Sequence, residues 1–497
     1  MVERVQVLWF KRDLRVQDHP ALVGAAAVGP VLPLFVVEPD YYRESEVSAR
    51  HWTALKPGLE DLAQELASMG AGLVLRQGDM CTVLSDLYRR VGPFDLWSHQ
   101  ETGTAWTFAR DQAVSAWCAE HKVTWHQPMT FGVWRGAALN RDRWAARWDG
   151  LMAQAQMSPP SARWVHAPSE ALTDPMPLDS GHQVARRATA LADLESFLHA
   201  RGQSYRRAMS SPLEGAQACS RLSVPLAYGV ISMREVLQTA QARLMALEEM
   251  PPGPRRAWRA SISSFIARLH WHCHFIQKLE AEPEIEWRPM ARVYEGVRSL
   301  EGREPLLEAF EAGRTGYPFV DACLRSLKST GWINFRMRAM LMSFASYDLF
   351  LPWQDAGQVL ARWFTDFEPG IHWSQCQMQS GETGINTIRV YSPIKQGLDQ
   401  DPNGVFTRTW VPELAHLEGA AIHTPWTEGG VPGYPAPVVD HKEAVREAKA
   451  KLFAIRRTDA ARAEADQVQK KHGSRKRLGG RKPAQPPKAV GDLFDGL

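Results

Sequence analysis

The first 135 residues alternate short apolar runs with segments of helical periodicity, and this alternation is the feature that most constrains the fold. The apolar runs are predicted to be strands at Val5–Phe10, Val31–Val37, Gly72–Leu75, Phe94–Ser98 and Val123–His126. The segments between them are predicted to be helices at Pro20–Ala27, Ala49–Met69, Thr82–Arg90 and Ala105–Glu120. Most of the strands are apolar on both faces, so the pattern predicts an α/β domain over residues 1–135 with a doubly wound parallel sheet.

The rest of the chain changes character twice. Residues 136–190 are rich in proline, serine and polar residues, which predicts a connector that crosses the surface between two domains. Residues 191–440 have apolar spacing near 3.6 and predict an all-α domain, in which a large flat cofactor can lie between helices. Its helices are expected at Leu191–Ala200, Met233–Glu248, Ile262–Leu279, Leu306–Ala312, Pro318–Ser329, Asn334–Leu349 and Ala356–Phe364.

Length and composition exclude several classes of protein. A chain of 497 residues is too long for one hydrophobic core, in agreement with two domains. No apolar run approaches the roughly 20 residues of a membrane helix, and no basic segment precedes an apolar one at the N-terminus. We therefore expect a cytoplasmic monomer without membrane contact. The six cysteines are scattered without a C-x-x-C pair, so we assign no metal or iron–sulfur ligands.

Residues 441–497 combine a predicted exposed helix, Lys442–Gln469, with a basic tail. The tail carries eight basic residues with no acid between them, namely Lys470, Lys471, Arg475, Lys476, Arg477, Arg481, Lys482 and Lys488. Glycine and proline fill the gaps, so the tail is predicted to be disordered. Because the whole chain has a net charge of only +3, its positive charge is concentrated here. Both a nucleic-acid-binding arm and a solubilising tail have this pattern.

A second group of motifs lies in residues 313–391. It comprises Arg-Thr-Gly-Tyr-Pro-Phe-Val-Asp, Gly-Trp-Ile-Asn-Phe-Arg, Asp-Phe-Glu-Pro-Gly and Thr-Gly-Ile-Asn-Thr-Ile-Arg. With Leu-Trp-Phe-Lys-Arg-Asp-Leu-Arg near the N-terminus, and in this order, the motifs resemble the photolyase/cryptochrome family of light-driven flavoproteins. The resemblance extends from the first strand to about Leu417. It implies FAD as the cofactor of the helical domain and UV-damaged DNA as a partner.

The resemblance implies a flavin site assembled from distant segments. The implied cofactor contacts are Tyr205, Cys219, Ser220, Arg221, Leu222, Ser223, Phe265, His272, Phe335, Arg338, Asp366, Glu368 and His372. The loop Cys219–Ser223 matches the pyrophosphate site, since hydroxyls and helix-start N–H groups suit an anion, although alone it would be a simple helix cap. Asp366 is implied beside the flavin ring and paired with Arg338, a cation that favours anionic flavin.

One predicted helix carries residues implied to contact DNA. Arg268 and Trp271 recur with other aromatic residues at three- and four-residue intervals, so they share one helix face, as a core stripe also would. Trp271 matches a tryptophan that stacks on an extruded pyrimidine dimer. Arg268 replaces the glutamate of enzymes that repair cyclobutane dimers, and arginine cannot accept a hydrogen bond. Further DNA contacts are expected at Arg336 and in the tail, at Lys470, Lys471, Arg475, Lys476 and Arg477.

Several positions depart from the family pattern. Of the three tryptophans that carry electrons to the flavin, the middle one matches Trp353 while the inner one falls on Cys376. Trp373, three residues before Cys376, is one candidate replacement, and Trp332, Trp363 and Trp287 are further candidates for a rerouted chain. The histidine pair of enzymes that act on (6-4) photoproducts falls on Phe335 and Ala339, which cannot transfer a proton. The acid that binds a folate antenna in some members falls on a threonine, so the antenna pigment stays unassigned.

Three hypotheses for function are compatible with these residues. In the first, a photolyase splits cyclobutane pyrimidine dimers by electron transfer from excited reduced FAD. In the second, a cryptochrome-like sensor reduces its flavin in blue light and repairs nothing. In the third, a flavin or nucleic-acid-binding module has lost its photochemistry. Arg268 favours the second, whereas Trp271 and the basic tail favour the first, which is the one we adopt.

Overall fold

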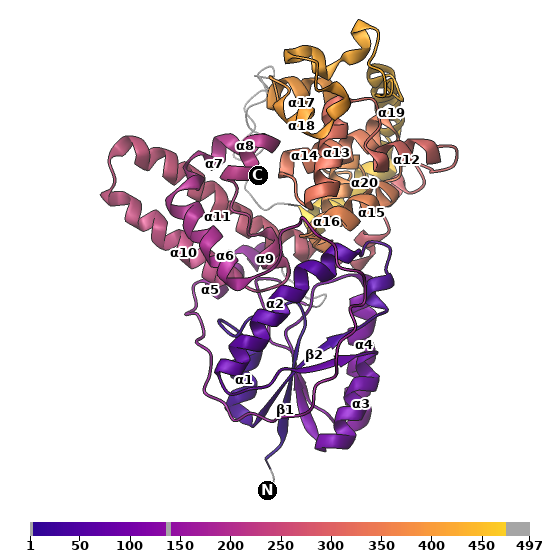
Figure 1. Ribbon diagram of the computed structural model, residues 1–497. Coiled ribbons are helices and arrows are strands. Elements are labelled where there is room, and N and C mark those ends of the chain that lie inside the picture. Colours follow the sequence, from indigo (N-terminus) through magenta and orange to yellow (C-terminus); the bar gives the residue numbers. More distant parts are fainter. Residues whose placement is uncertain (1–2, 136–140, 474–497) are drawn as a thin grey trace.

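The computed structural model describes residues 3–135 and 141–473 and divides them into an α/β half and a helical half (Figure 1). The α/β half contains a five-stranded sheet with the order β3-β2-β1-β4-β5. Its strands are β1 (Val5–Phe10), β2 (Val31–Val37), β3 (Val74–Gln77), β4 (Phe94–Trp97) and β5 (Trp125–His126). All neighbouring strands pair in parallel. The predicted parallel sheet is therefore confirmed.

Helices cover both faces of the sheet. They are α1 (Pro20–Val28), α2 (Ala49–Ser68), α3 (Met80–Val91) and α4 (Ala105–His121). Along β1, Leu8 and Phe10 belong to the core under α1 and α2, whereas Val7 and Trp9 belong to the core under α3 and α4. This alternation follows from the two-residue period of a strand, and it explains why the strand is apolar throughout.

The segment predicted as a surface connector is partly packed. Within it lies α5 (Trp144–Met152), whose Trp144 and Trp148 are buried. Both indole rings contact His270 of the long helix that follows, at centroid distances of 4.8 and 5.0 Å. The backbone further along also reaches the sheet, because Trp164 bridges to Val31. The polar composition of the segment gave no indication that these tryptophans are buried.

The remainder of the described chain is helical, with no strand in residues 187–473. Its helices are α6 (Arg187–His199), α7 (Tyr205–Ala208), α8 (Pro212–Ala218), α9 (Ser223–Ala227), α10 (Met233–Ala246), α11 (Pro252–Ala281), α12 (Glu304–Ala312), α13 (Pro318–Thr330), α14 (Phe335–Ser343), α15 (Trp353–Trp363), α16 (Pro369–Ser380), α17 (Pro393–Gln400), α18 (Val405–Trp410), α19 (His441–Arg456) and α20 (Asp459–His472). Short 3-10 turns are η1 (Tyr41–Arg43), η2 (Arg141–Arg143), η3 (Arg201–Ser204), η4 (Leu247–Glu249), η5 (Pro283–Glu286), η6 (Arg292–Tyr294), η8 (Pro412–Leu414), η9 (Gly419–His423) and η10 (Pro425–Glu428). Among the described helices none is both long and apolar enough to span a bilayer.

Three predicted helices are wrong in their extent. The helix predicted over Ile262–Leu279 is α11, which begins already at Pro252. The helix predicted over Asn334–Leu349 is α14 followed by a π-helical turn, η7 (Phe344–Asp348). Such turns insert an extra residue into a helix and often occur at functional sites. The single exposed helix predicted over Lys442–Gln469 is the pair α19 and α20, separated where Thr458 caps α20.

The C-terminal helices are also less exposed than their composition predicts. Leu452 and Val468 are buried in the helical core. Lys470 and Lys471, predicted to lie in the disordered tail, belong to α20, where the Lys471 ammonium pairs with Glu282 at 2.9 Å. The predicted DNA contacts Arg475, Lys476 and Arg477 lie outside the described residues.

Side chains of the α/β half bind backbone carbonyls of the helical half. Arg12 donates from Nε to the carbonyl of Ala227 at 2.8 Å and from Nη2 to that of Phe367 at 3.0 Å. Arg50 donates to the Trp363 carbonyl at 2.6 Å, and His51 to the Phe364 carbonyl at 3.0 Å. Hydrogen bonds from charged arginine donors are strong, so Arg12 and Arg50, together with the neutral His51, hold the end of α15 and the loop that follows it against the α/β half.

Gly229 lies where the two halves meet, and a substitution there tests how closely the halves pack. Its φ is +67°, and a Cβ there would lie 2.3 Å from the carbonyl oxygen of Arg12. Gly296 has a φ of +75° with nothing within 4 Å of its added Cβ, so it is a matched control. We expect Gly296→Ala to cost about 1 kcal/mol through its backbone alone. Gly229→Ala should cost about 1–3 kcal/mol more, because the halves must separate.

The free energy of unfolding of both variants, measured by urea denaturation, checks this expectation. Equal losses for Gly229→Ala and Gly296→Ala would show that the junction tolerates a methyl group.

Candidate functional site

A cavity of about 560 Å³ opens among the helices of the second half. Its volume lies in the range typical of cavities that bind small molecules and cofactors. The walls come from α7, α9, α11, α14 and α16 and from the loops on either side of α16. At Gly370, α16 approaches α11 so closely that a Cβ would lie 2.5 Å from the Ile276 Cα. Close helix packing thus closes one side of the cavity.

Many of the residues singled out in the sequence line this cavity. They are Tyr205, Cys219, Ser223, Arg268, Trp271, His272, Phe335, Arg338, Asp366, Glu368 and His372. Other singled-out residues do not line it, namely Ser220, Arg221, Leu222, Phe265, Arg336, Trp353 and Trp373. Leu222 and Phe265 are buried in the core behind the wall, where Phe265 packs against Phe197 with a centroid distance of 4.8 Å. Helical periodicity predicts which residues share one face of a helix, but it does not predict how deeply each of them is buried.

Arg338 and Asp366 form a bidentate ion pair in the cavity wall. Arg338 Nη1 and Nη2 donate to the two carboxylate oxygens at 3.0 and 2.8 Å. Burial acts to raise the pKa of Asp366, but the charge and hydrogen bonds of Arg338 outweigh it and lower that pKa. Asp366 is therefore ionised at neutral pH. Since Arg338 also lies over the ring of Phe364, the pair holds the start of the loop in place.

Buried polar atoms in the wall lack protein partners. Asn334 Oδ1 and Glu368 Oε1 are buried without a hydrogen bond from the protein, and both residues line the cavity. Burial raises the pKa of Glu368 to about 7, although Arg12 lies 3.7 Å away and opposes the shift. Unsatisfied buried acceptors are costly, so a ligand that donates hydrogen bonds to these two atoms would be favoured in the cavity. The wall thus fits a flavin, whose ring and ribose both carry donors.

The wall contains polar and aromatic residues that sequence reasoning did not place at the flavin, among them Trp332, Asn334, Asn386 and Arg389. A signal was present, since all four lie within the motifs of residues 313–391. Arg221, although outside the cavity, packs over Trp332 with its guanidinium carbon 4.0 Å from the ring centroid. Its φ of +62° is unusual for a residue with a side chain, which indicates that the loop backbone is constrained there.

A chain of aromatic rings leads away from the cavity. His372, in the wall, packs against Trp373 with a centroid distance of 4.7 Å, and Trp373 contacts Trp353 at 5.9 Å. Burial lowers the pKa of His372 to about 4, so its imidazole is neutral. Its Nε2–H donates to the Gly357 carbonyl at 2.9 Å. Cys376 Sγ lies 3.5 Å from the same nitrogen, at the position where the family pattern has its inner tryptophan.

On the opposite wall, α11 presents Arg268 and Trp271 to the cavity. The Trp271 ring packs against Phe275 with a centroid distance of 5.5 Å. Arg268 lies beside the hydroxyl of Tyr205. Burial raises the pKa of this hydroxyl, and Arg268 opposes the shift. The shared helix face expected from the residue spacing is thus observed, with its polar and aromatic members facing a cavity rather than a closed core.

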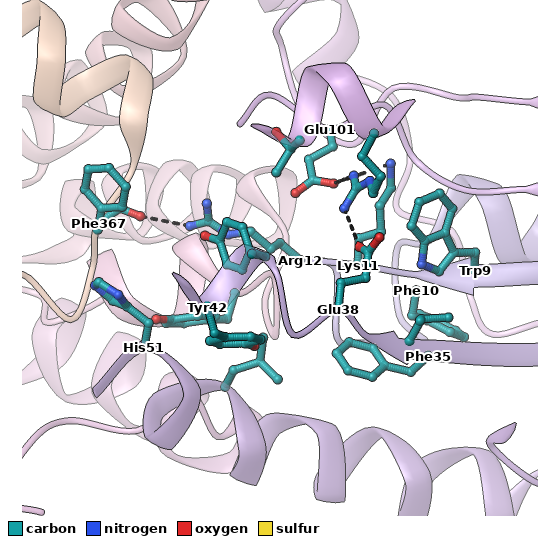
Figure 2. A pocket seen from close by; sticks show the side chains of 16 residues that line it. Trp9, Phe10, Lys11, Arg12, Phe35, Glu38, Tyr42, His51, Glu101 and Phe367 are labelled. Carbon is teal, nitrogen blue, oxygen red and sulfur yellow. Dashed lines mark hydrogen bonds and ion pairs between the residues drawn. The ribbon is translucent and has the colours of Figure 1, made fainter. Parts of the chain in front are cut away.

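A smaller cavity of about 70 Å³ lies where the carboxyl ends of β1 and β2 meet the helical half (Figure 2). Its wall contains a buried charge cluster, in which Arg110 pairs with Glu38 at 2.9 Å and with Glu101, and Lys11 lies 3.5 Å from Glu101. Trp9 packs against both cations. Cavities that hold drug-sized ligands begin near roughly 300 Å³, so this smaller cavity gives no ground for assigning an antenna pigment.

Three buried side chains, Asp13, His19 and His99, meet beside that cavity with ligand-type atoms within 4.8 Å of one another. Both imidazoles contact Asp13 Oδ2, at 3.1 and 2.6 Å. The second nitrogen of each ring accepts a backbone N–H, from Leu22 and Ala21. The nitrogens that face Asp13 must therefore carry protons, which leaves them no lone pair for a metal. The cluster instead ties together the ends of two strands and the start of α1.

Comparisons with known proteins agree with this arrangement. The family model described as "DNA photolyase" matches residues 6–135, and that described as "FAD binding domain of DNA photolyase" matches residues 265–454. A deoxyribodipyrimidine photo-lyase of Vibrio cholerae is 28% identical, with 90% of this chain and 99% of the relative aligned. Cryptochrome-1 of Arabidopsis thaliana is 25% identical over 90% of this chain and 69% of its own length. The crystal structure of a bacterial class III photolyase from Agrobacterium tumefaciens superposes with a TM-score of 0.77 at 24% identity, covering 92% and 99% of the two chains.

Loss of the Asp366 carboxylate should weaken both the fold and FAD binding. In Asp366→Asn the Arg338 guanidinium keeps a neutral acceptor but loses its counter-charge. A hydrogen bond to a charged group contributes about 1.5–3 kcal/mol, so we expect a stability loss of that order and a lower FAD content. The free energy of unfolding and the flavin absorbance per protein measure the two effects.

The control is Asp459→Asn, which removes a carboxylate that pairs with Arg462 at the surface. This variant should change neither quantity. Wild-type flavin content and stability in Asp366→Asn would show that the ion pair is dispensable.

Proposed function

The chain belongs to the photolyase/cryptochrome family and carries its FAD-binding domain, and on this premise we propose that it repairs cyclobutane pyrimidine dimers in UV-damaged DNA. The observation that carries the proposal is one shared cavity. The Asp366–Arg338 pair, implied to lie at the flavin, and Trp271, implied to lie at the lesion, face the same space. An extruded dimer in that cavity would therefore lie next to the cofactor.

FAD, when bound and reduced, supplies the absorption of blue light and the electron that opens the dimer. The chain's residues bind and orient both partners. Arg338 and Asp366 hold the flavin side of the cavity. Trp271, with Phe275 behind it, offers an aromatic surface on which an unstacked base can lie. Arg268 beside it can donate hydrogen bonds to a base carbonyl or a phosphate, in place of an accepting carboxylate.

Other residues supply a route for electrons from within the protein to the flavin. His372 lines the cavity, and Trp373 and Trp353 follow it in ring contact. We assign the tryptophans as donors that keep the flavin reduced. Cys376, at the family's inner tryptophan position, has a thiol whose pKa burial raises, so it stays neutral and is not assigned a part in the route.

A second candidate function is a blue-light sensor. Arg268 favours it, because this arginine stands where the lesion-contacting glutamate is expected. The part of α11 that lines the cavity contains no acidic residue in its place. The similarity to a plant cryptochrome is compatible with it. In a sensor the tryptophan route would be the function itself, and Trp271 would be a wall residue without a base to bind. The two candidates therefore differ in what Trp271 does.

Replacement of Trp271 separates the two candidates. If a dimer stacks on this ring, Trp271→Ala should lower the preference for dimer-containing over undamaged DNA by about 1–3 kcal/mol and reduce light-driven repair. Binding to both oligonucleotides and dimer loss under blue light are the measurements. The control is Trp287→Ala, since Trp287 is 47% exposed and outside the cavity. Equal affinity of the wild-type protein for both DNAs, without repair, would favour the sensor.

Replacement of Trp353 tests the electron route. In Trp353→Phe, photoreduction of bound FAD by an external reductant should slow by about tenfold or more, since a tenfold change needs only about 1.4 kcal/mol in the barrier. Repair by chemically reduced protein should be unchanged, because the electron then starts on the flavin. The flavin absorption under constant illumination gives the rate. A wild-type rate in this variant would assign photoreduction to another route.

A further inference from the structure

A third cavity, of about 30 Å³, lies between the two cavities described above and shares walls with both. With the large cavity of about 560 Å³ it shares Ala227, His272 and Glu368. With the cavity of about 70 Å³ at the junction of the two halves it shares Lys11, Arg12 and Glu101, which Figure 2 labels apart from the middle cavity itself. The three cavities therefore follow one another from the helical half to the ends of the strands.

The middle cavity is suited to bound water. A buried water needs roughly 10–15 Å³ of space and two to four polar partners, so about two waters fit here. Two acceptors in its wall, Gln100 Oε1 and Glu368 Oε1, are buried without a hydrogen bond from the described part of the chain. The cationic groups of Lys11 and Arg12 lie in the same wall. Waters that donate to the two acceptors satisfy groups that are otherwise unpaired.

The middle cavity connects a surface loop with the interior. Residues 100–102, which line its outer side, are only half-buried, whereas Glu368 is 9% exposed. Arg12 holds Glu368 at the boundary with the large cavity, because its Nη2 lies 3.7 Å from Glu368 Oε2 while the guanidinium also binds the carbonyls of Ala227 and Phe367. Glu368 Oε1 can therefore bond a water on one side or a ligand on the other.

Burial raises the pKa of Glu368 to about 7, so this carboxyl both holds and releases a proton near neutral pH. The groups that surround it do not. Burial raises the pKa values of Tyr41 and Cys273 and lowers that of His272 to about 4, so all three are neutral. Glu101 is ionised, because Arg110 and Lys11 outweigh its burial and lower its pKa. Asp13 and His99, which also line the middle cavity, bond each other at 2.6 Å.

We propose that Glu368 passes protons between waters of the middle cavity and the large cavity when bound FAD is reduced. The inference rests on the FAD-binding domain and on neither repair nor the tryptophan route. Addition of an electron makes a flavin more basic. The O–H bond of the Glu368 carboxyl then breaks, and its proton enters the large cavity. A water of the middle cavity reprotonates the carboxylate and regains its own proton from solvent at residues 100–102, so one proton follows each electron.

Pulse radiolysis with formate tests the proton step, because the radical that it generates reduces FAD in the dark, without tryptophans or DNA. Flavin absorption separates arrival of the electron from the protonation that follows. In Glu368→Gln the protonation should slow by about a hundredfold, the usual contribution of a general acid. The control is Glu382→Gln, which alters another buried glutamate paired with an arginine, Arg298, outside the three cavities. Its rate should equal that of the wild type.

Replacement of Gln100 tests the waters and leaves Glu368 in place. Gln100→Met removes one acceptor from the middle cavity, so protonation should slow by about fivefold, the factor that corresponds to one ordinary hydrogen bond. The control is Gln396→Met in α17, because Gln396 Oε1 is also buried without a partner in the described chain but lies outside the three cavities. This control should protonate the flavin at the wild-type rate.

The wild-type protein gives an independent test through pH. Above about pH 7 the Glu368 carboxyl is ionised and has no proton to give, so protonation should slow as the pH rises. In the dark, the infrared carbonyl band of the protonated carboxyl, identified by its loss in Glu368→Gln, should disappear over the same pH interval.

Four results would overturn the proposal. These are a wild-type protonation rate in Glu368→Gln, equal slowing in Glu382→Gln, a wild-type rate in Gln100→Met, and a Glu368 carboxyl that is ionised at every pH at which the protein is folded. Failure of the repair function would be seen separately, as a normal proton step in a protein that leaves dimers intact under blue light.

Discussion

The Arg338–Asp366 ion pair is the interaction on which the rest of the structure depends. It fixes the loop between α15 and α16 from the side of the helical half. The α/β half binds the same loop, because Arg12 and His51 donate to the carbonyls of Phe367 and Phe364. A buried carboxylate needs a partner that satisfies its charge, and once Arg338 supplies it, the cavity wall and the domain junction share one rigid segment.

The same segment links the cavity to the interior. His372 lies in the first turn of α16, which begins directly after the loop, so the position of the loop influences the contact of His372 with Trp373 and, through it, with Trp353. Elsewhere in the helical half, Arg298 and Glu382 form a second buried ion pair. In the first the carboxylate has a lowered pKa, whereas in the second burial raises it.

The sequence analysis succeeded where local pattern and packing agree. The strands of the sheet were predicted from runs such as Val31–Val37. These runs are apolar throughout because both faces of the strand are buried. It failed where contacts distant in sequence decide the structure. Lys471, at the end of α20, pairs with Glu282, and Trp144 is buried against His270 of α11. Neither partner is visible in the composition of the segment itself.

For the site, the sequence by itself determined which chemical groups are present: the paired Asp366 and Arg338, the tryptophans, and an arginine in place of an accepting acid at Arg268. Order and spacing of the motifs were enough to relate them to a flavin-binding family. Only the tertiary structure decided which of these groups share a cavity, and that Leu222 and Phe265 lie behind its wall. The physical reason is that burial and distance, which set pKa values and electron routes, arise from packing between segments far apart in the chain, and no single segment encodes them.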